Sequence, residues 1–195
     1  MARTQRERRE ATVAGLLGAS IATIAEIGYA RASAKTIARR AGVSDGALFR
    51  HFDTMCDFMA ATAQEVLRRQ VELISKQVAE IPANGSALEA VLTVLRDLTA
   101  NSNSAVIYEL LIAARTDENL RTALAEVLDE YGAKIYDTAR GFPGADAFPE
   151  ELFPSVVALL TNTFDGASIV RAVLPQPEIE ANRIPLLLKL LAGQT

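Results

Sequence analysis

The sequence predicts an all-α protein. Apolar residues recur with the spacing of a helix along most of the 195 residues, and no stretch alternates polar and apolar residues as a strand would. Serine, threonine or aspartate stands just before several of these stretches, where such residues cap helix N-termini. Half of the residues are hydrophobic and 23% are charged, which is the composition of a folded chain rather than a disordered one. The length suits one or two domains.

Two short helices joined by a tight turn are predicted between Ser33 and Phe52. Ser33 and Ser44 each come one residue before a helical pattern, where the hydroxyl can accept a hydrogen bond from a free backbone N–H. Gly42 ends the first helix, because glycine adopts the left-handed conformation there at little cost. This spacing is that of a helix-turn-helix, whose second helix, here Ser44 to His51, presents its N-terminal side chains to the DNA major groove.

The same stretch resembles the N-terminal domain of the tetracycline-repressor (TetR) family. The matching residues are Gly28-Tyr29, Ile37-Ala38 and Ala41-Gly42-Val43-Ser44-x-Gly46-Ala47-Leu48-Phe49-x-His51-Phe52. The specific match runs from Leu16 to Phe58, and the remainder agrees with the family in being helical and of similar length. The resemblance implies a three-helix helix-turn-helix DNA-binding domain over residues 1–53 (the head). It also implies a C-terminal helical ligand-binding and dimerisation domain over residues 54–195 (the body).

Charge is divided unevenly between these two parts. The head holds nine Lys or Arg residues and five Asp or Glu residues, which gives it a net charge of +4. The whole chain carries −4, so the body carries −8. A basic head on an acidic body indicates that the head meets phosphates and the body does not.

Residue type suggests roles for the head residues. Arg50 can form a bidentate contact with a guanine edge, and Lys35 and Arg39, one helical turn apart, can neutralise phosphates. The N-terminal arm is either a solvated terminus or follows the DNA backbone or minor groove through Arg3 and Arg6. By resemblance His51 contacts the DNA backbone, and its alternative is an aromatic residue at the edge of the core. The expected DNA-contacting set is Arg3, Arg6, Ser33, Lys35, Thr36, Arg39, Ser44, Asp45, Gly46, Phe49, Arg50 and His51.

The remaining helices are predicted from periodicity and from their start and stop residues. Thr54 and Asp57 have the spacing of a capping box, Pro82–Gly85 breaks the long helix that follows, and residues 101–103 form a loop. Pro175 and Pro177 end the penultimate helix. The predicted ranges are Glu10–Ile27, Met55–Ile81, Ala87–Ala100, Ser104–Ala114, Asp117–Arg140, Pro149–Val173 and Pro185–Leu191.

The penultimate helix is apolar nearly all round, so it must lie in a core or in an interface. TetR-like proteins pair their last two helices with those of a second copy, and the resemblance implies a homodimer of this kind. Core packing alone is the alternative. A two-fold dimer also suits a palindromic DNA operator. The expected interface residues are Val156, Leu160, Phe164, Ala167, Val170, Leu187 and Leu191.

The resemblance further implies a small-molecule effector that binds among the body helices and changes the affinity for DNA, as in a repressor that its ligand releases. Polar residues within apolar helices are the candidates for the ligand site. The alternative for each of them, which the sequence favours, is a satisfied polar group of the core or of an interface. They are Tyr108, Glu109, Asn162, Thr163 and Asp165.

The sequence gives no support for enzymatic, metal or nucleotide-phosphate chemistry. Gly42, Ser44 and Gly46 fit a nucleophile elbow, but a helix precedes the serine where a strand is needed, and His51 is the only histidine. One cysteine and one histidine cannot build a usual zinc site, and no phosphate-binding glycine loop is present. We therefore expect no catalytic residues, no metal site and no cofactor.

The single cysteine, Cys56, rules out an intrachain disulfide, which favours a cytoplasmic protein. The basic N-terminus lacks the apolar core of a signal peptide. No apolar run approaches 20 residues, so no membrane span is expected.

Three residues depart from the family pattern and favour an alternative function. Asp45 stands where a basic or neutral residue is common, Phe49 lacks the hydroxyl of the usual tyrosine, and Met55 replaces a lysine that often meets phosphate. These departures predict a shallower salt dependence of DNA binding. The alternative is therefore a helical protein that binds a small molecule or a partner and whose DNA recognition is degenerate.

Overall fold

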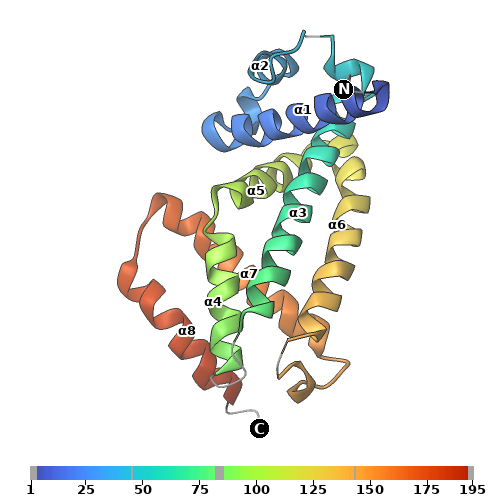
Figure 1. Ribbon diagram of the computed structural model, residues 1–195. Coiled ribbons are helices and arrows are strands. Elements are labelled where there is room, and N and C mark those ends of the chain that lie inside the picture. Colours follow the sequence, from blue (N-terminus) through green and yellow to red (C-terminus); the bar gives the residue numbers. More distant parts are fainter. Residues whose placement is uncertain (1–3, 45, 82–85, 143, 193–195) are drawn as a thin grey trace. The chain divides into compact units, whose positions relative to one another are not determined.

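The computed structural model describes residues 4–44, 46–81, 86–142 and 144–192, and every regular element in these ranges is a helix (Figure 1). The predicted all-α class is therefore confirmed. The α-helices are α1 (Gln5–Ile27), α2 (Ala34–Arg40), α3 (Met55–Ala79), α4 (Ala87–Thr99), α5 (Ser102–Ala114), α6 (Glu118–Arg140), α7 (Phe153–Val173) and α8 (Pro177–Ala192). The 3-10 helices are η1 (Tyr29–Arg31), η2 (Leu48–Arg50) and η3 (Ala145–Ala147).

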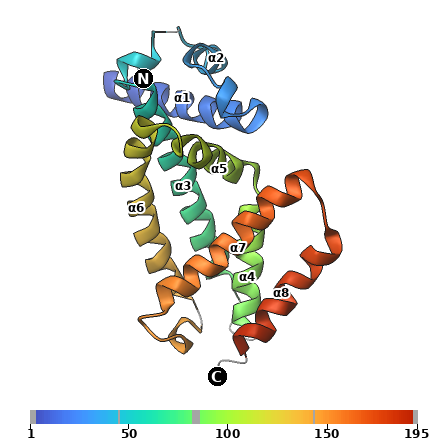
Figure 2. The ribbon, with the colours of Figure 1, turned by 180° about the vertical axis from the view of Figure 1, so that it is seen from behind.

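The first compact unit comprises residues 1–69 and 102–131. It holds α1, α2, η1, η2, α5 and the adjoining parts of α3 and α6. α1 packs on α2 and on α5, as both views of the ribbon show (Figures 1 and 2). Leu16, Ile37, Leu48 and Phe58 are fully buried in one continuous apolar core that joins these helices.

The second compact unit comprises residues 70–101 and 132–195. α4 packs on both α7 and α8, and the remaining parts of α3 and α6 complete the unit. Its apolar cluster has four buried members, which are Leu92 of α4, Leu160 and Phe164 of α7, and Ile184 of α8. The predicted boundary after Asp53 divides the chain by expected function. The two units are defined by packing, so that boundary stays a prediction.

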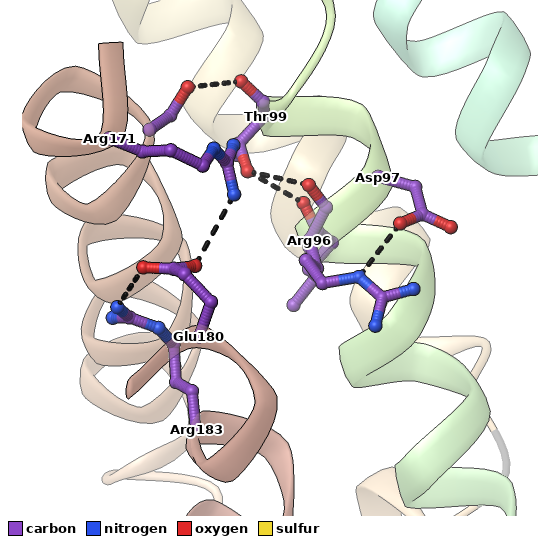
Figure 3. A network of polar contacts seen from close by, with 8 residues as sticks. Arg96, Asp97, Thr99, Arg171, Glu180 and Arg183 are labelled. Carbon is purple, nitrogen blue, oxygen red and sulfur yellow. Dashed lines mark hydrogen bonds and ion pairs between the residues drawn. The ribbon is translucent and has the colours of Figure 1, made fainter. Parts of the chain in front are cut away.

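Polar contacts also hold the helices of the second unit together (Figure 3). The hydroxyl of Ser168 donates to the carbonyl oxygen of Thr99 at 2.6 Å, which ties α7 to the end of α4. The carboxylate of Glu180 accepts from Arg183 on its own helix at 2.6 Å and from Arg171 on α7 at 3.3 Å. Glu180 therefore joins α8 to α7 by charge in addition to apolar packing.

Two predicted helix starts in the first unit are wrong. α1 begins at Gln5 rather than near Glu10, because Thr4 and Glu7 form a capping box whose two hydrogen bonds are 3.2 and 2.8 Å long. Arg6 therefore lies on a helix and not on an extended arm. α5 begins at Ser102 rather than Ser104, so the expected loop at 101–103 is shorter than predicted.

Two predicted starts in the second unit are wrong because proline was assigned the wrong role. α8 begins at Pro177, since the first residue of a helix needs no N–H donor, and Pro185 lies inside it. α7 begins at Phe153, and Pro149 instead forms the preceding turn by accepting from the N–H of Leu152 at 3.0 Å. The predicted break at Pro82–Gly85 lies outside the described residues.

The expectation that no apolar run is long enough to span a membrane does not hold for two helices. By length and composition alone, α1 and α7 could each do so. A core helix passes the same test, and α1 is one, with Leu16, Ile21 and Ile24 buried. α7 is different, because only 11% of its apolar window is buried in the chain.

Candidate nucleic-acid interface

The turn of the helix-turn-helix is built as the sequence predicts. Gly42 adopts a left-handed conformation with φ +70°. Its N–H donates to the carbonyl of Arg39 at 3.2 Å, and the N–H of Val43 donates to the carbonyl of Ala38 at 3.0 Å. These two bonds are a Schellman motif, which satisfies the last carbonyls of α2. At the other end of α2, the hydroxyl of Ser33 accepts from the N–H of Thr36 at 3.2 Å.

The second helix of the motif is shorter than predicted. The structure forms a 3-10 helix over Leu48–Arg50 where a longer helix, from Ser44 to His51, is expected. The N–H of Ala47 donates to the carbonyl of Ser44 at 2.9 Å, which begins the turn. Leu48 is fully buried and fixes this segment to the core of the first unit. The buried leucine thus leaves its neighbours Phe49 and Arg50 on the surface.

The exposed cations of the motif are Lys35, Arg39 and Arg50. Of the ion pairs formed by residues 4–44 and 46–53, none engages any of these three side chains. Two other head arginines are occupied. Arg40 donates to the hydroxyl of Thr23 at 3.1 Å and pairs with Glu26, and the Nε of Arg31 donates to the carbonyl of Ile27 at 2.6 Å. The count of basic residues in the head therefore overstates the charge that is free to meet DNA.

The other predicted contact residues differ in availability. Arg6 is exposed but pairs with Glu10 at 2.8 Å, and the hydroxyls of Ser33 and Thr36 lie 2.9 Å apart in a hydrogen bond. Ser44 and Gly46 are exposed, and Phe49 is 51% exposed. Arg3 and Asp45 lie outside the described residues.

His51 is half-buried at the end of η2. Its Nδ1 is shielded from solvent, and no group of the described residues forms a hydrogen bond with it.

Glu109 links α5 to the segment that follows α1. Its carboxylate accepts from the backbone N–H of Tyr29 at 2.6 Å. Gly28 has φ +82°, and a Cβ atom there would lie 3.3 Å from a carboxylate oxygen of Glu109. Burial, with a smaller contribution from the nearby charge of Asp117, raises the pKa of the Tyr29 phenol. Glu109, which was expected to bind ligand, is therefore occupied in holding η1. The sequence signal for this role is that Glu109 is the single charged residue of an otherwise largely apolar helix.

The other expected ligand residues are distributed over both units. Tyr108 is half-buried on α5 and takes part in a polar interaction. On α7, the hydroxyl of Thr163 donates to the carbonyl of Leu159 at 2.6 Å, Asp165 is also engaged, and Asn162 is exposed.

A groove of about 650 Å³ in the first unit contains none of these expected ligand residues. It lies between α1 and α3, with Val13 and Leu17 among its apolar members and Arg9 among its charged ones. Glu65 of α3 also lines it. Hydrogen bonds from Arg68 and, secondarily, Arg69 hold the pKa of the Glu65 carboxyl below its usual value against the opposing effect of burial. No cluster of metal-binding side chains occurs in the described ranges.

Most of the expected interface residues lie inside the second unit. Leu160 and Phe164 belong to its buried core, Ala167 is buried, and Val156, Leu187 and Leu191 pack against that core. Only Val170 is strongly exposed, at 52%. α7 is apolar on nearly all sides, so periodicity does not distinguish its inward face from its outward one. The large apolar side chains that do face outward on α7 and α8 are Leu159, Ile169, Val170, Val173, Ile179, Leu186 and Leu190.

The comparisons agree with this architecture. The model of the family described as "Bacterial regulatory proteins, tetR family" matches residues 16–62. Uncharacterized HTH-type transcriptional regulators of Mycobacterium tuberculosis and Mycobacterium bovis are 68% identical over 193 residues, which is 99% of this chain and 99% of theirs.

Solved structures share the fold. A Rhodococcus protein assigned to the TetR family of transcriptional regulators is 20% identical and aligns with a TM-score of 0.73 over 94% of this chain and 98% of its own. The multidrug-binding protein EbrR, solved with ethidium, is 22% identical and aligns with a TM-score of 0.64 over 92% and 98%. This chain belongs to the TetR family of bacterial transcriptional regulators.

Proposed function

We propose that this protein is a ligand-responsive repressor that binds a palindromic operator as a homodimer in the cytoplasm and is released by a small molecule. The observation that carries the proposal is the set of unpaired cations around the helix-turn-helix. Lys35, Arg39 and Arg50 are exposed and without ion pairs in the described head, whereas Arg31 and Arg40 are bonded within the protein. Unpaired cations beside a reading segment are what phosphate and base-edge recognition require.

In this proposal the expected contact residues of the head have different roles on DNA. Arg50 contacts a base edge, and Lys35 and Arg39 neutralise phosphates. His51 and the hydroxyls of Ser33, Thr36 and Ser44 donate to phosphate oxygens. Gly46 allows the backbone to approach the duplex closely. Arg3 and Arg6 contact the DNA backbone or the minor groove, and the carboxylate of Asp45 accepts from a cytosine amine.

Support for a small-molecule effector comes from the structural neighbours and from α5. EbrR was solved with ethidium and with imidazole, so this fold accommodates small molecules. In this chain α5 packs on α1, and its Glu109 bonds the backbone of Tyr29. A ligand that shifts α5 would therefore act on the head. Tyr108, Asn162, Thr163 and Asp165 remain candidates for ligand contacts, and no enzymatic activity or cofactor is part of the proposal.

The experiment starts with selection of bound duplexes from random DNA, followed by affinity measurements from low to high salt. We expect a steep fall of affinity with salt for the wild-type protein. Arg39→Ala should make the slope of log affinity against log salt shallower by about 2, because a dimer loses two phosphate contacts at about 0.9 each.

The matched control is Arg40→Ala, which removes the same charge from the next residue of α2. We expect it to leave the slope within experimental error, because Arg40 is already paired with Glu26. Both variants are first checked for folding by circular dichroism. A folded wild-type protein that binds no duplex at low salt would overturn the proposal and favour the degenerate alternative. Equal slopes for the two variants would overturn the phosphate role of Arg39.

A further inference from the structure

The outward side of α7 is a continuous surface without charge. Residues Leu159, Asn162, Gly166, Val170 and Val173, here called the outer face, follow each other at intervals of three or four and so share one side of the helix. All five are exposed, with Leu159 at 59% and Val173 at 88%. The opposite side of α7 carries the residues buried against α4 and α8.

The charged residues of α7 do not belong to the outer face. α7 contains two of them, Asp165 and Arg171, and the guanidinium of Arg171 is paired with Glu180 of α8 (Figure 3). A surface without charge can meet an identical surface without repulsion. Exposed apolar side chains of this size in a row mark a contact surface in soluble proteins.

Gly166 stands at the centre of the outer face, and nothing in the part of the chain that the structure describes requires a glycine there. A Cβ atom at this position would meet no other atom within 4 Å. Its φ is not positive, so other residues could adopt the same conformation. Glycine in an exposed helix interior destabilises the helix relative to alanine. The compensating advantage of a missing side chain is that another backbone can approach closely.

We propose that α7 of a second copy crosses this helix at Gly166, with the two glycines facing each other across a two-fold axis. In a two-fold contact, residue i of one copy meets residue j of the other, and j meets i. The same face must therefore be able to pack against itself. Leu159 and Val173 flank the crossing seven residues away on either side and would pack beside the partner's helix. This inference rests on the proposed homodimer and specifies its point of closest approach.

α8 also exposes large apolar side chains. Ile179, Leu186 and Leu190 of α8 are each more than half exposed. The ion pair from Glu180 to Arg171 joins α8 to α7. The polar amide of Asn162 in this apolar surface favours a protein partner over lipid, because a partner helix can supply its hydrogen bond whereas hydrocarbon cannot.

The test compares substitutions at two glycines. Gly132 is the matched control, because it also lies in an exposed helix interior with no atom within 4 Å of a Cβ. Gly166→Leu should raise the dissociation constant of the dimer at least tenfold, and Gly166→Ala should have a smaller effect in the same direction. Gly132→Leu should leave the constant unchanged. Sedimentation velocity from nanomolar to micromolar protein measures all four forms.

A second readout separates loss of contact from loss of folding. In dilute solution, where the protein is monomeric, Gly166→Ala should melt at the same temperature as the wild type or higher, because alanine is the better helix former. Val173→Ser, at an almost fully exposed position, should also weaken the dimer without lowering the melting temperature of the monomer.

The outcomes distinguish the two proposals. A wild-type protein that stays monomeric at micromolar concentration would overturn the homodimer and this inference together. A stable dimer whose dissociation constant is unchanged by Gly166→Leu would overturn this inference alone. Flotation of the wild-type protein with phosphatidylcholine vesicles, lost in Val173→Ser, would overturn it in favour of a lipid surface.

Discussion

The first and second units bury their apolar residues to different degrees. Among the described residues, the core cluster of the first unit has 19 buried members, whereas that of the second has four. Strongly exposed large apolar side chains show the opposite distribution. Three of them lie in the first unit (Phe49, Leu111 and Ile112), and ten lie in the second. The first unit thus closes its own core, and the second leaves more of its large apolar side chains exposed.

This difference teaches that apolar content alone does not distinguish a core from a contact surface. α1 and α7 are similar in length and hydropathy, yet 33% of the apolar window of α1 is buried, against 11% for α7. Burial follows from what surrounds each helix. α1 has α2 and α5 on its sides, whereas the outer face of α7 has no described neighbour.

The largest effect is expected from Phe58→Ala in the core of the first unit. Phe58 is fully buried, and its ring centroid lies 4.8 Å from that of Phe52. Removal of a buried aromatic side chain costs about 3–5 kcal/mol of the free energy of unfolding. Urea titrations at two protein concentrations measure it. The loss should be the same at both concentrations, and a concentration-dependent loss would contradict the self-contained core of the first unit.

A smaller effect is expected from Phe49→Ala, at the exposed aromatic of the head. Removal of a half-exposed side chain should change the free energy of unfolding by less than about 0.5 kcal/mol. Affinity for selected DNA should fall about fivefold to tenfold, because an apolar ring beside Arg50 can contact a thymine methyl group.

Duplexes with deoxyuridine in place of single thymines provide the control for Phe49. The wild-type protein should lose affinity at one position of each half-site, and Phe49→Ala should not respond there. Equal responses of the two proteins would show that Phe49 reads no methyl group, while DNA binding itself would stand.

The smallest effect is expected at Glu65, on the groove of the first unit. Hydrogen bonds from Arg68 and Arg69 lower the pKa of this carboxyl below the ordinary value of 4.5. A lowered pKa stabilises the folded protein above the ordinary value, and the stabilisation is lost as the pH falls through the folded value. Glu65→Gln should therefore cost about 0.5 kcal/mol at pH 7, since both arginines are about half exposed. Urea titrations at pH 7 and pH 3 measure the difference, and a cost that persists at pH 3 would contradict the ion-pair origin.

Local signals predicted the helix caps and the turn of the head. Ser33, Gly42 and the Thr54–Asp57 pair act through hydrogen bonds within three residues or the next turn, so their spacing identifies them. Thr54 and Asp57 form the predicted capping box, with bonds of 3.0 and 3.1 Å. The length of η2 was not predicted, because a 3-10 helix and a short α-helix share their sequence pattern over so few residues.

Long-range features were not predicted. The inward side of α7 depends on α4 and α8, and its own sequence is apolar in nearly every direction. Pro177 was assigned only to the end of the penultimate helix, and it is also the first residue of α8, because proline can follow one helix and begin the next. Met55, which replaces a lysine of the family pattern, packs against the core of the first unit. Tertiary neighbours decided each of these outcomes.

The hydrogen bond between Glu109 and the backbone of Tyr29 limits how such regulators can be recombined. Consider a chimera that joins the head of another regulator to this body after residue 53. The segment that follows α1 would then come from the other protein, whereas the Glu109 carboxylate that it meets is suited to Gly28 and Tyr29. A head whose equivalent of Gly28 carries a side chain would press against that carboxylate. Sensors built by exchange of heads should therefore carry α5 along with the head that it supports.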